Sequence, residues 1–338
     1  MLHWGIVSTG GIAHRAAKAL QSKDTAGLAC AHAVYSRSME KARQFAGEFG
    51  IAQAYDSLDA MLADPQVEAV YVANPHPFHC ETVLKAAAAG KHILCEKTLA
   101  MNLSQAEKMV KAAKSNRILL TEAFTYRVCK RTRKLRELLQ TKAVGKLQHL
   151  TCNFFFQSEK APARLTEKEL GGGAMLDLGC YAMSMARMVA GISEGKVYSE
   201  PQVLAGHAQF AANGIDDYAC ALLRFSNGMG ASLACGIHAQ RTLGLSIIGS
   251  EGRIEIDEPW FEQGVLRLIR GKNQHAEIFD YSAAAPDRFA DLFAHISRCV
   301  QEGRTELPEM TPEDSLGNVA ALDAWRRKIG LFYAEDSY

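Results

Sequence analysis

The fold of this chain is decided by its first strand and the turn after it, where residues 2–21 read LHWGIVSTGGIAHRAAKALQ. The apolar run from Leu2 to Ser8 predicts a β-strand, and residues 12–21 predict a helix. Between them lies a turn of small residues, Ser8-Thr9-Gly10-Gly11-Ile12-Ala13. A dinucleotide-binding fold needs small residues here, because they permit the tight turn and let the backbone approach a pyrophosphate. The N-terminus of the helix would then offer N–H groups to the phosphates.

Strand-like and helix-like patterns continue to alternate through residues 1–123. Further strands are predicted at residues 28–35, 67–73, 92–95 and 118–122, and further helices at 39–49 and 104–114. Alternation of this kind implies a parallel sheet with helices on both faces. We therefore predict an α/β protein whose residues 1–123 form a doubly wound Rossmann domain that binds a dinucleotide.

The pattern changes after residue 124, where a helix at 131–140 leads to a strand at 147–157 and a helix at 173–190. Further strand candidates follow, separated by the turn dipeptides Asn213-Gly214, Asn227-Gly228 and Glu251-Gly252. Strands joined by short turns pair antiparallel. Residues 124–338 are thus predicted to form an α+β domain with a mostly antiparallel sheet, whose two closing helices can pack back on the first domain.

Composition excludes several classes of function. The 338 residues suit two domains, and 38 basic against 37 acidic residues give no electrostatic reason to expect nucleic acid or an anionic membrane as partner. The nine cysteines are odd in number and widely spaced without a C-x-x-C pair, which is not a disulfide framework. No metal site is predicted, because no His, Cys, Asp and Glu cluster has metal-ligand spacing. With no signal peptide and no membrane-length apolar run, the sequence predicts a cytoplasmic protein.

The end of the second predicted strand, Ser36-Arg37-Ser38, bears on the choice of coenzyme. NAD-specific folds usually place an acid there for the ribose 2′-hydroxyl, whereas an arginine suits the 2′-phosphate of NADP. The sequence therefore favours NADP over NAD, and a solvated arginine is the alternative. At the next strand end, Asn74, Pro75 and His79 are further coenzyme-binding candidates, although His79 could instead cap the following helix.

Two other segments are candidates for the chemistry. Glu96 and Lys97 end the fourth predicted strand, and ligands of open parallel sheets bind outside the carboxyl ends of the strands. Asp177 and Tyr181 follow the glycine run 171–173 and are four residues apart, so on a helix they share a face. The alternatives are an ordinary surface lysine, and two buried polar groups that satisfy each other.

Hydride transfer to or from an alcohol carbon requires a proton donor or acceptor at the oxygen. A tyrosine phenol has a pKa of about 10, and a neighbouring lysine lowers that value. Tyr181 with Lys97 would thus make an acid–base pair, with Asp177 holding a substrate hydroxyl or Lys97 itself. Arg127 and Arg164 are further candidates for substrate contact, with salt bridges as their alternative role.

The order of these segments resembles the Gfo/Idh/MocA oxidoreductases, the glucose–fructose oxidoreductase family. The resemblance is carried by Ala89-Gly90-Lys91-His92, Cys95-Glu96-Lys97 and the run from Gly171 to Tyr181. It implies a Rossmann domain followed by an open-faced sheet that often forms dimers, with Lys97 and Tyr181 catalytic and Asp177 beside them. Tyrosine at position 181 is similar to the branch of dimeric dihydrodiol dehydrogenases and NADP-dependent xylose dehydrogenases. Ser8 departs from the first glycine of the family turn, and Thr98 from the proline of Glu-Lys-Pro.

The sequence thus predicts an NADP-dependent oxidoreductase that moves hydride between nicotinamide C4 and a carbinol carbon of a trans-dihydrodiol, aldose or related polyol. A homodimer or homotetramer through the C-terminal sheet is expected. The consecutive Phe154, Phe155 and Phe156 fit this, because alternate rings on a strand face opposite sides, one towards the core and one towards a subunit interface. The alternative is a non-catalytic, NADP-sensing regulatory or scaffold protein of the same fold.

Overall fold

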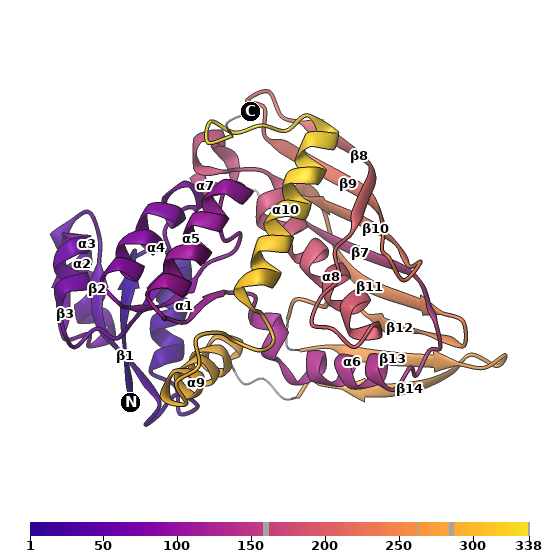
Figure 1. Ribbon diagram of the computed structural model, residues 1–338, viewed down its shortest axis with the longest axis horizontal. Helices are drawn as coiled ribbons and strands as arrows, with labels where there is room; N and C mark the ends of the chain where they lie inside the picture. Colours follow the sequence, from indigo (N-terminus) through magenta and orange to yellow (C-terminus); the bar gives the residue numbers. More distant parts are fainter. Residues whose placement is uncertain (158–161, 262, 284–286, 337–338) are drawn as a thin grey trace. The chain divides into compact units, whose positions relative to one another are not determined.

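The computed structural model describes residues 1–157, 162–261, 263–283 and 287–336. Its chain divides into two compact units (Figure 1). The first unit comprises Met1–Ala100, Ser104–Thr125 and Pro286–Leu316, and the second comprises Met101–Leu103, Tyr126–Ala285 and Gly317–Tyr338. Segments from near the C-terminus therefore belong to both units.

The first unit is built on a six-stranded sheet in which every neighbouring pair is parallel. Its order is β3-β2-β1-β4-β5-β6, so the direction of winding reverses between β1 and β4. The strands are β1 (Leu2–Val7), β2 (Ala29–Tyr35), β3 (Gln53–Tyr55), β4 (Ala69–Val72), β5 (His92–Cys95) and β6 (Leu120–Glu122). This doubly wound order confirms the predicted Rossmann fold and creates a crevice at the reversal.

Helices cover this sheet with alanine-rich or apolar faces. In α1 the buried side chains are alanines and one leucine, which let the helix lie close to the sheet. The helices of the first unit are α1 (Gly11–Leu20), α2 (Met39–Phe49), α3 (Leu58–Ala63), η1 (His76–Phe78), α4 (His79–Ala88), α5 (Leu103–Ser115) and α9 (Arg288–Gln301). Helix α9 reaches the sheet from late in the chain, and its Phe293 ring lies 4.8 Å from Trp4 and 5.6 Å from Tyr71.

The second unit holds an eight-stranded sheet in the order β14-β13-β12-β11-β7-β10-β9-β8. Only the pairing of β10 with β7 is parallel among these, which confirms the predicted, mostly antiparallel sheet. The strands are β7 (Leu147–Gln157), β8 (Gln202–Phe210), β9 (Asp216–Arg224), β10 (Gly230–Gly236), β11 (His238–Gly249), β12 (Gly252–Ile256), β13 (Val265–Arg270) and β14 (His275–Asp280).

Two of the predicted turns use glycine for the same physical reason. Gly214 and Gly228 adopt φ angles of 79° and 87°, a left-handed conformation that other residues rarely take. The preceding asparagine stabilises each turn, since the Asn227 side chain accepts a hydrogen bond from Met229 N at 2.9 Å. These turns set the antiparallel pairing of β8 with β9 and of β9 with β10.

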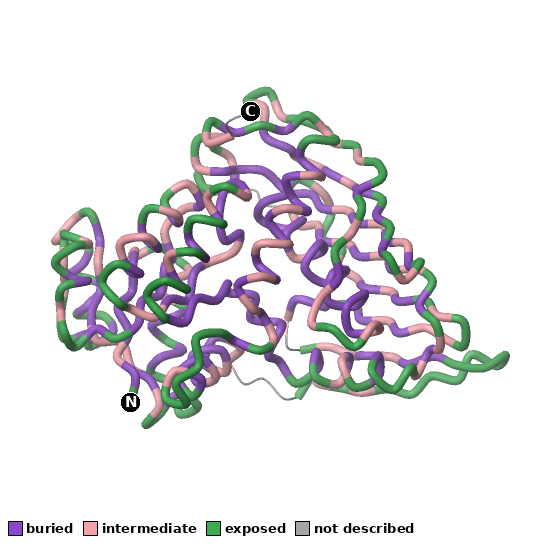
Figure 2. The backbone as a smooth tube through the Cα atoms, viewed as in Figure 1, coloured by how far each residue is buried: buried purple, intermediate pink, exposed green. Residues whose placement is uncertain are grey.

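The two faces of the second sheet differ in burial, since buried and more exposed residues alternate along strands such as β9, a change of colour along the tube that can be followed in Figure 2. Helix α8 (Cys180–Ser193) packs on one face and is buried along nearly its whole length. Along β7 the alternation of the phenylalanines is confirmed, because Phe154 packs beside Tyr181 whereas Phe155 stacks on Tyr218. The other helical segments are η2 (Thr125–Val128), α6 (Lys130–Gln140), α7 (Ala163–Thr166), η3 (Lys168–Leu170), η4 (Met175–Gly179) and α10 (Pro312–Ile329). Within the described ranges, no helix has both the length and the apolar character to cross a bilayer.

Candidate functional site

The glycine-rich turn of the first unit contains a serine in a conformation that favours glycine. Ser8 follows β1 with φ of 106°, where an L-residue is strained. Its backbone N–H donates to Tyr35 O at 2.9 Å, and its Oγ accepts from Gly10 N at 3.2 Å. The serine therefore occupies the place of the family's first glycine at a cost in backbone strain, partly offset by this hydrogen bond.

The start of α1 lies open beside this turn. The N-cap residue Gly10 makes no side-chain cap, so the first N–H groups of the helix keep their hydrogen-bonding capacity. A Cβ added at Gly11 would meet no atom within 4 Å, and one at Gly10 would meet only Ser8 Oγ at 3.6 Å. Ile12 is half-buried in the first helical turn. Such an exposed helix N-terminus suits a pyrophosphate.

A cavity of about 500 Å³ lies at the carboxyl ends of β1, β2 and β4. It brings together seven of the residues predicted to bind coenzyme, namely Ser8, Thr9, Ser36, Arg37, Ser38, Asn74 and Pro75. It is also lined by residues that the sequence did not single out, among them Lys41, Thr82 and Lys85. The position of this cavity at the reversal of strand order is where doubly wound folds bind ligands.

Two of the cations in this cavity are available to an anion. Lys85 is held by Glu81 and Asp59, each at 3.3 Å, whereas neither Arg37 nor Lys41 has an ion pair in the described part of the chain. Ser38 caps α2 by accepting from Lys41 N at 3.4 Å, which fixes where Lys41 leaves the helix. A phosphate ester is the kind of group that such a pair of cations binds.

The segment after β5 is held by histidines and a tyrosine of the first unit. Tyr71 Oη donates to Glu96 Oε1 at 2.5 Å, and His76 Nε2 lies 3.0 Å from Lys97 O. The peptide bond between Lys97 and Thr98 is cis, and Thr98 is buried. These contacts fix the backbone of Lys97 at the end of the strand, where the sequence predicts it.

His79 does not lie in the cavity. Its ring has no exposed surface; Nε2 lies 2.9 Å from Asn74 O and Nδ1 lies 3.0 Å from Thr98 O. Burial lowers the pKa of His79 despite these carbonyls. The structure therefore gives His79 a structural role, tying the end of β4 to the Lys97 segment, in place of the predicted contact with coenzyme.

In the second unit, the glycine run precedes a helix that does not begin as predicted. Residues 175–179 form a π-helical turn (η4), and the α-helix starts only at Cys180, whereas the sequence predicts a regular helix over 173–190. Gly172 is required because a Cβ there would lie 2.7 Å from Glu167 O. Single π-turns within helices occur frequently at functional sites.

Tyr181 follows this π-turn and is surrounded by aromatic rings of the second unit. Its ring centroid lies 5.5 Å from Phe154, 5.4 Å from Trp260 and 6.2 Å from Tyr126. Phe154 and Trp260 are themselves stacked at 5.5 Å. These rings restrict the orientation of the Tyr181 side chain.

Two of the predicted substrate residues meet, and the third is enclosed. Arg164 Nη1 lies 2.7 Å from Asp177 Oδ1, and the Arg164 side chain is 47% exposed against 6% for Asp177. Arg127 has no exposed surface and donates to Tyr126 Oη at 3.0 Å and Ser184 Oγ at 2.8 Å. The structure thus supports an accessible arginine at position 164 and gives Arg127 a structural role in place of substrate contact.

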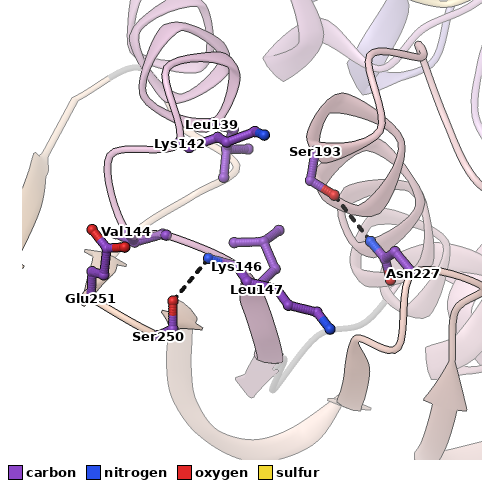
Figure 3. A pocket seen from close by; sticks show the side chains of 10 residues that line it. Leu139, Lys142, Val144, Lys146, Leu147, Ser193, Asn227, Ser250 and Glu251 are labelled. Carbon is purple, nitrogen blue, oxygen red and sulfur yellow. Dashed lines mark hydrogen bonds between the residues drawn. The ribbon is translucent and has the colours of Figure 1, made fainter.

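A second cavity, of about 660 Å³, lies near the ends of α6 and α8 (Figure 3). None of the predicted site residues lines it. Two pairs of its polar groups bind each other, Lys146 N with Ser250 Oγ and Asn227 Nδ2 with Ser193 Oγ, each at 3.0 Å. Across the part of the chain that the structure describes, no group of three or more His, Cys, Asp or Glu side chains could hold a metal ion.

Comparison with family models matches both units. Residues 2–124 match the oxidoreductase family with an NAD-binding Rossmann fold, and residues 132–255 match the C-terminal domain of the same family. The chain belongs to the Gfo/Idh/MocA family. This member is therefore an oxidoreductase with an NAD(P)-binding Rossmann domain.

Relatives cover the whole length of this family member. The trans-1,2-dihydrobenzene-1,2-diol dehydrogenase of Xenopus tropicalis is 31% identical over 337 residues, with 98% of each chain covered. The enzyme of the same name from Mus musculus is 29% identical over 337 residues, with 99% of each covered. The 3-ketoreductase KijD10 of Actinomadura kijaniata, solved with NADP and TDP-benzene, has a TM-score of 0.85 at 26% identity and covers 97% of this chain and 98% of its own. A levoglucosan dehydrogenase, at 18% identity and TM-score 0.86, shares the fold.

Ser8→Gly relieves roughly 1–3 kcal/mol of strain, but the entropy cost of glycine and the loss of the hydrogen bond to Gly10 N offset this relief, so the stability is expected to stay nearly unchanged. Ser8→Ala keeps the strain and loses the hydrogen bond to Gly10 N, so it is expected to destabilise by about 1 kcal/mol. Urea unfolding of both variants measures the difference. Equal destabilisation by the two substitutions would show that the φ angle at Ser8 carries no strain.

Proposed function

We propose that this family member is an NADP-dependent oxidoreductase that transfers hydride between nicotinamide C4 and a carbinol carbon of a trans-dihydrodiol, aldose or related polyol. The observation that carries the proposal is the cavity lined by Arg37 and Lys41, in a chain that also holds Tyr181 directly after a π-turn. Relatives named dihydrodiol dehydrogenases and a ketoreductase solved with NADP support the substrate class and the coenzyme.

The residues of the first unit fit an NADP molecule. Gly10 and Gly11 leave room for a pyrophosphate at the start of α1. No neighbouring atom lies within 4 Å of the position that a Cβ at Gly11 would take. Arg37, with Ser36 and Ser38, would bind the 2′-phosphate, and Lys41 adds a second cation. Asn74 and Pro75 would border the nicotinamide half, with Glu96 and Lys97 at the next strand end.

The nicotinamide, when bound, supplies or accepts the hydride. In the oxidative direction the carbinol O–H bond breaks as its proton passes to Tyr181 Oη, and the carbinol carbon becomes a carbonyl. Lys97 would assist by favouring the phenolate form of the tyrosine. Asp177 and Arg164 would offer an acceptor and donors to the remaining hydroxyls of a polyol, which would suit polyhydroxylated substrates.

We call the face of the second sheet that carries Phe155 and Tyr218, opposite the face on which α8 packs, the bare face. It is the surface through which we expect a homodimer or homotetramer. Leu222 is 51% exposed and Ile248 is 39% exposed on its strands, and the Phe155 and Tyr218 rings stack on the same face. Exposed apolar side chains on a broad sheet face are typical of subunit contacts.

Arg37→Ala is expected to weaken NADPH binding by about tenfold to hundredfold, because a charge-assisted hydrogen bond to the 2′-phosphate is lost. NADH has no 2′-phosphate, so its binding should stay nearly unchanged. Arg43→Ala is the matched control, because Arg43 is an exposed cation of α2 that does not line the cavity. Titration of coenzyme fluorescence gives both dissociation constants. An equal loss for NADPH and NADH, or tighter binding of NADH by the unaltered protein, contradicts the role given to Arg37.

Tyr181→Phe is expected to lower turnover by about a hundredfold to ten-thousandfold while NADPH binding persists, because the general acid–base group is removed. The assay follows absorbance at 340 nm with NADP⁺ or NAD⁺ against trans-dihydrodiols, xylose, glucose and inositols. Tyr218→Phe, which removes a phenol from the bare sheet face, should retain activity. Undiminished turnover in Tyr181→Phe contradicts the mechanism. Tight NADPH binding without turnover of any of these compounds favours the NADP-sensing alternative.

A further inference from the structure

The start of the helix that carries Asp177 and Tyr181 is fastened to the sheet by a buried acid. Asp216, the first residue of β9, has no exposed surface, and its Oδ2 accepts a hydrogen bond from Met175 N at 2.7 Å. That N–H belongs to the first turn of the helix, where no backbone partner exists. The carboxylate thus takes the place of an N-cap, although it comes from a strand 41 residues further along the chain.

The space around this hydrogen bond admits only glycine at position 173 and a short carboxyl side chain at position 216. Gly173 adopts φ of 121°, and a Cβ added there would collide with Asp216 Oδ1. On the other side of the turn, the buried Tyr333 Oη donates to Gly172 O at 2.8 Å. The third glycine of the run is therefore explained by the approach of Asp216.

The far end of the π-turn is equally tightly packed. A Cβ added at Gly179 would lie 3.1 Å from Cys235 Sγ and 3.2 Å from Trp325 Cζ3. The segment between Gly173 and Gly179 is thus held at both ends, by Asp216 at its start and by Cys235 and Trp325 at its finish. Side chains that project from this segment take their positions from those two contacts.

We propose that Asp216 is a positioning residue for the reaction, which sets the π-turn and through it the places of Asp177 and Tyr181, and whose protonation changes how firmly that turn is held. The proposal rests on the proposed function for the roles of Asp177 and Tyr181. Asp216 itself touches neither coenzyme nor substrate, because it has no exposed surface.

The surroundings of Asp216 place its titration in the neutral range. Burial raises the pKa of Asp216 to about 7, the Met175 amide opposes this shift, and nearby Asp217 adds to it. Among the described residues, the ionisable groups that interact with it are Asp217 on the same strand, Cys235 on β10 and Tyr333 near the C-terminus, and none of these three is a cation. An ionised Asp216 is therefore compensated mainly by backbone N–H groups at the helix start.

The sign of the pH effect follows from this raised value. In the closed turn Asp216 is buried against Met175 N, and in the open turn this contact is lost and the carboxyl group meets water. In the open turn Asp216 regains the usual carboxyl pKa of about 3.9, so the closed turn binds the proton more tightly. Closure is accordingly strongest at low pH and weakens as pH rises towards 7. Above the folded-state pKa both forms are ionised, and the effect levels off.

Amide hydrogen exchange of the full-length protein tests this without any substrate. Protection of residues 174–181, corrected for the intrinsic exchange rate, is expected to fall by up to about tenfold per pH unit between pH 5 and 7, the consequence of one proton. Peptides from α6 should not share this dependence. Asp216→Asn should abolish it, and Asp217→Asn should retain it, because Asp217 is partly exposed and paired with His238 at 2.9 Å.

Kinetics provide the second readout. Asp216→Ala, which removes the acceptor for Met175 N, is expected to lower kcat by about tenfold to hundredfold, as for a small displacement of reacting groups, and to leave the dissociation constant of NADPH unchanged, whereas Asp216→Asn keeps a neutral acceptor and much of kcat. A step in the pH profile of kcat near 7 should disappear in Asp216→Asn and persist in Asp217→Asn. A folded Asp216→Ala whose kcat is unchanged contradicts the positioning role.

Protection of residues 174–181 that does not change with pH in the unaltered protein overturns the proposal, even if Asp216→Asn fails to fold. Unchanged pH dependence in a folded Asp216→Asn overturns it as well. Absence of turnover with every compound tested counts against the proposed function alone, since the exchange measurement needs no substrate.

Discussion

Parallel pairing of β1 with both β2 and β4 is the constraint on which the cavity lined by Ser8, Arg37 and Asn74 depends. Because β1 lies between these strands, the chain winds in opposite directions on its two sides, and the carboxyl ends of the strands line a cavity at that point. Ser8, Arg37 and Asn74 come from three different strand ends, yet they line one cavity. The left-handed Ser8 and the open start of α1 are consequences of the same geometry, since the turn must leave β1 sharply to form the helix.

In the second unit, a few polar side chains lie in or beside an apolar, buried helix and are held there by specific contacts. Helix α8 is buried along almost its whole length, so it cannot adjust its position without disturbing the sheet beneath it. The aromatic rings around Tyr181, the pair between Arg164 and Asp177, and the buried Asp216 each restrict one part of this helix or its first turn. These contacts would hold Tyr181 in one orientation, which the proposed proton transfer needs.

Much of this could be predicted from the sequence, because the signals are local. Apolar runs bounded by turns predicted β5 and β7 with their observed bounds, and a strand-to-helix turn of small residues predicted the Rossmann domain. Strand β3, with three residues, and helix α3, with six, were missed because such short elements carry too little periodicity. Lys41 could have been found, since it lies one helical turn beyond Arg37 at the start of α2.

What could not be predicted depends on contacts between distant residues. The π-turn at Met175 is stabilised by Asp216, and the sequence of the glycine run does not indicate that Asp216 is its partner. Likewise, His79 and Arg127 look like ligands in sequence because they are polar, and only the fold encloses them. Polar residues that end the strands of a parallel sheet are brought together by the sheet itself, whereas the burial of a polar residue in a helix depends on partners that the local sequence does not show.

The most direct test of the account follows a deuterium label from substrate to coenzyme. The enzyme would be incubated with NADP⁺ and a trans-dihydrodiol or aldose deuterated at the carbinol or anomeric carbon, and the NADPH formed would be analysed by proton NMR. The account predicts deuterium at C4 of the nicotinamide, with one label per molecule of NADPH and none from deuterated water. Label that is lost to solvent, or coenzyme that stays oxidised while substrate is consumed, would contradict hydride transfer as the function of this protein.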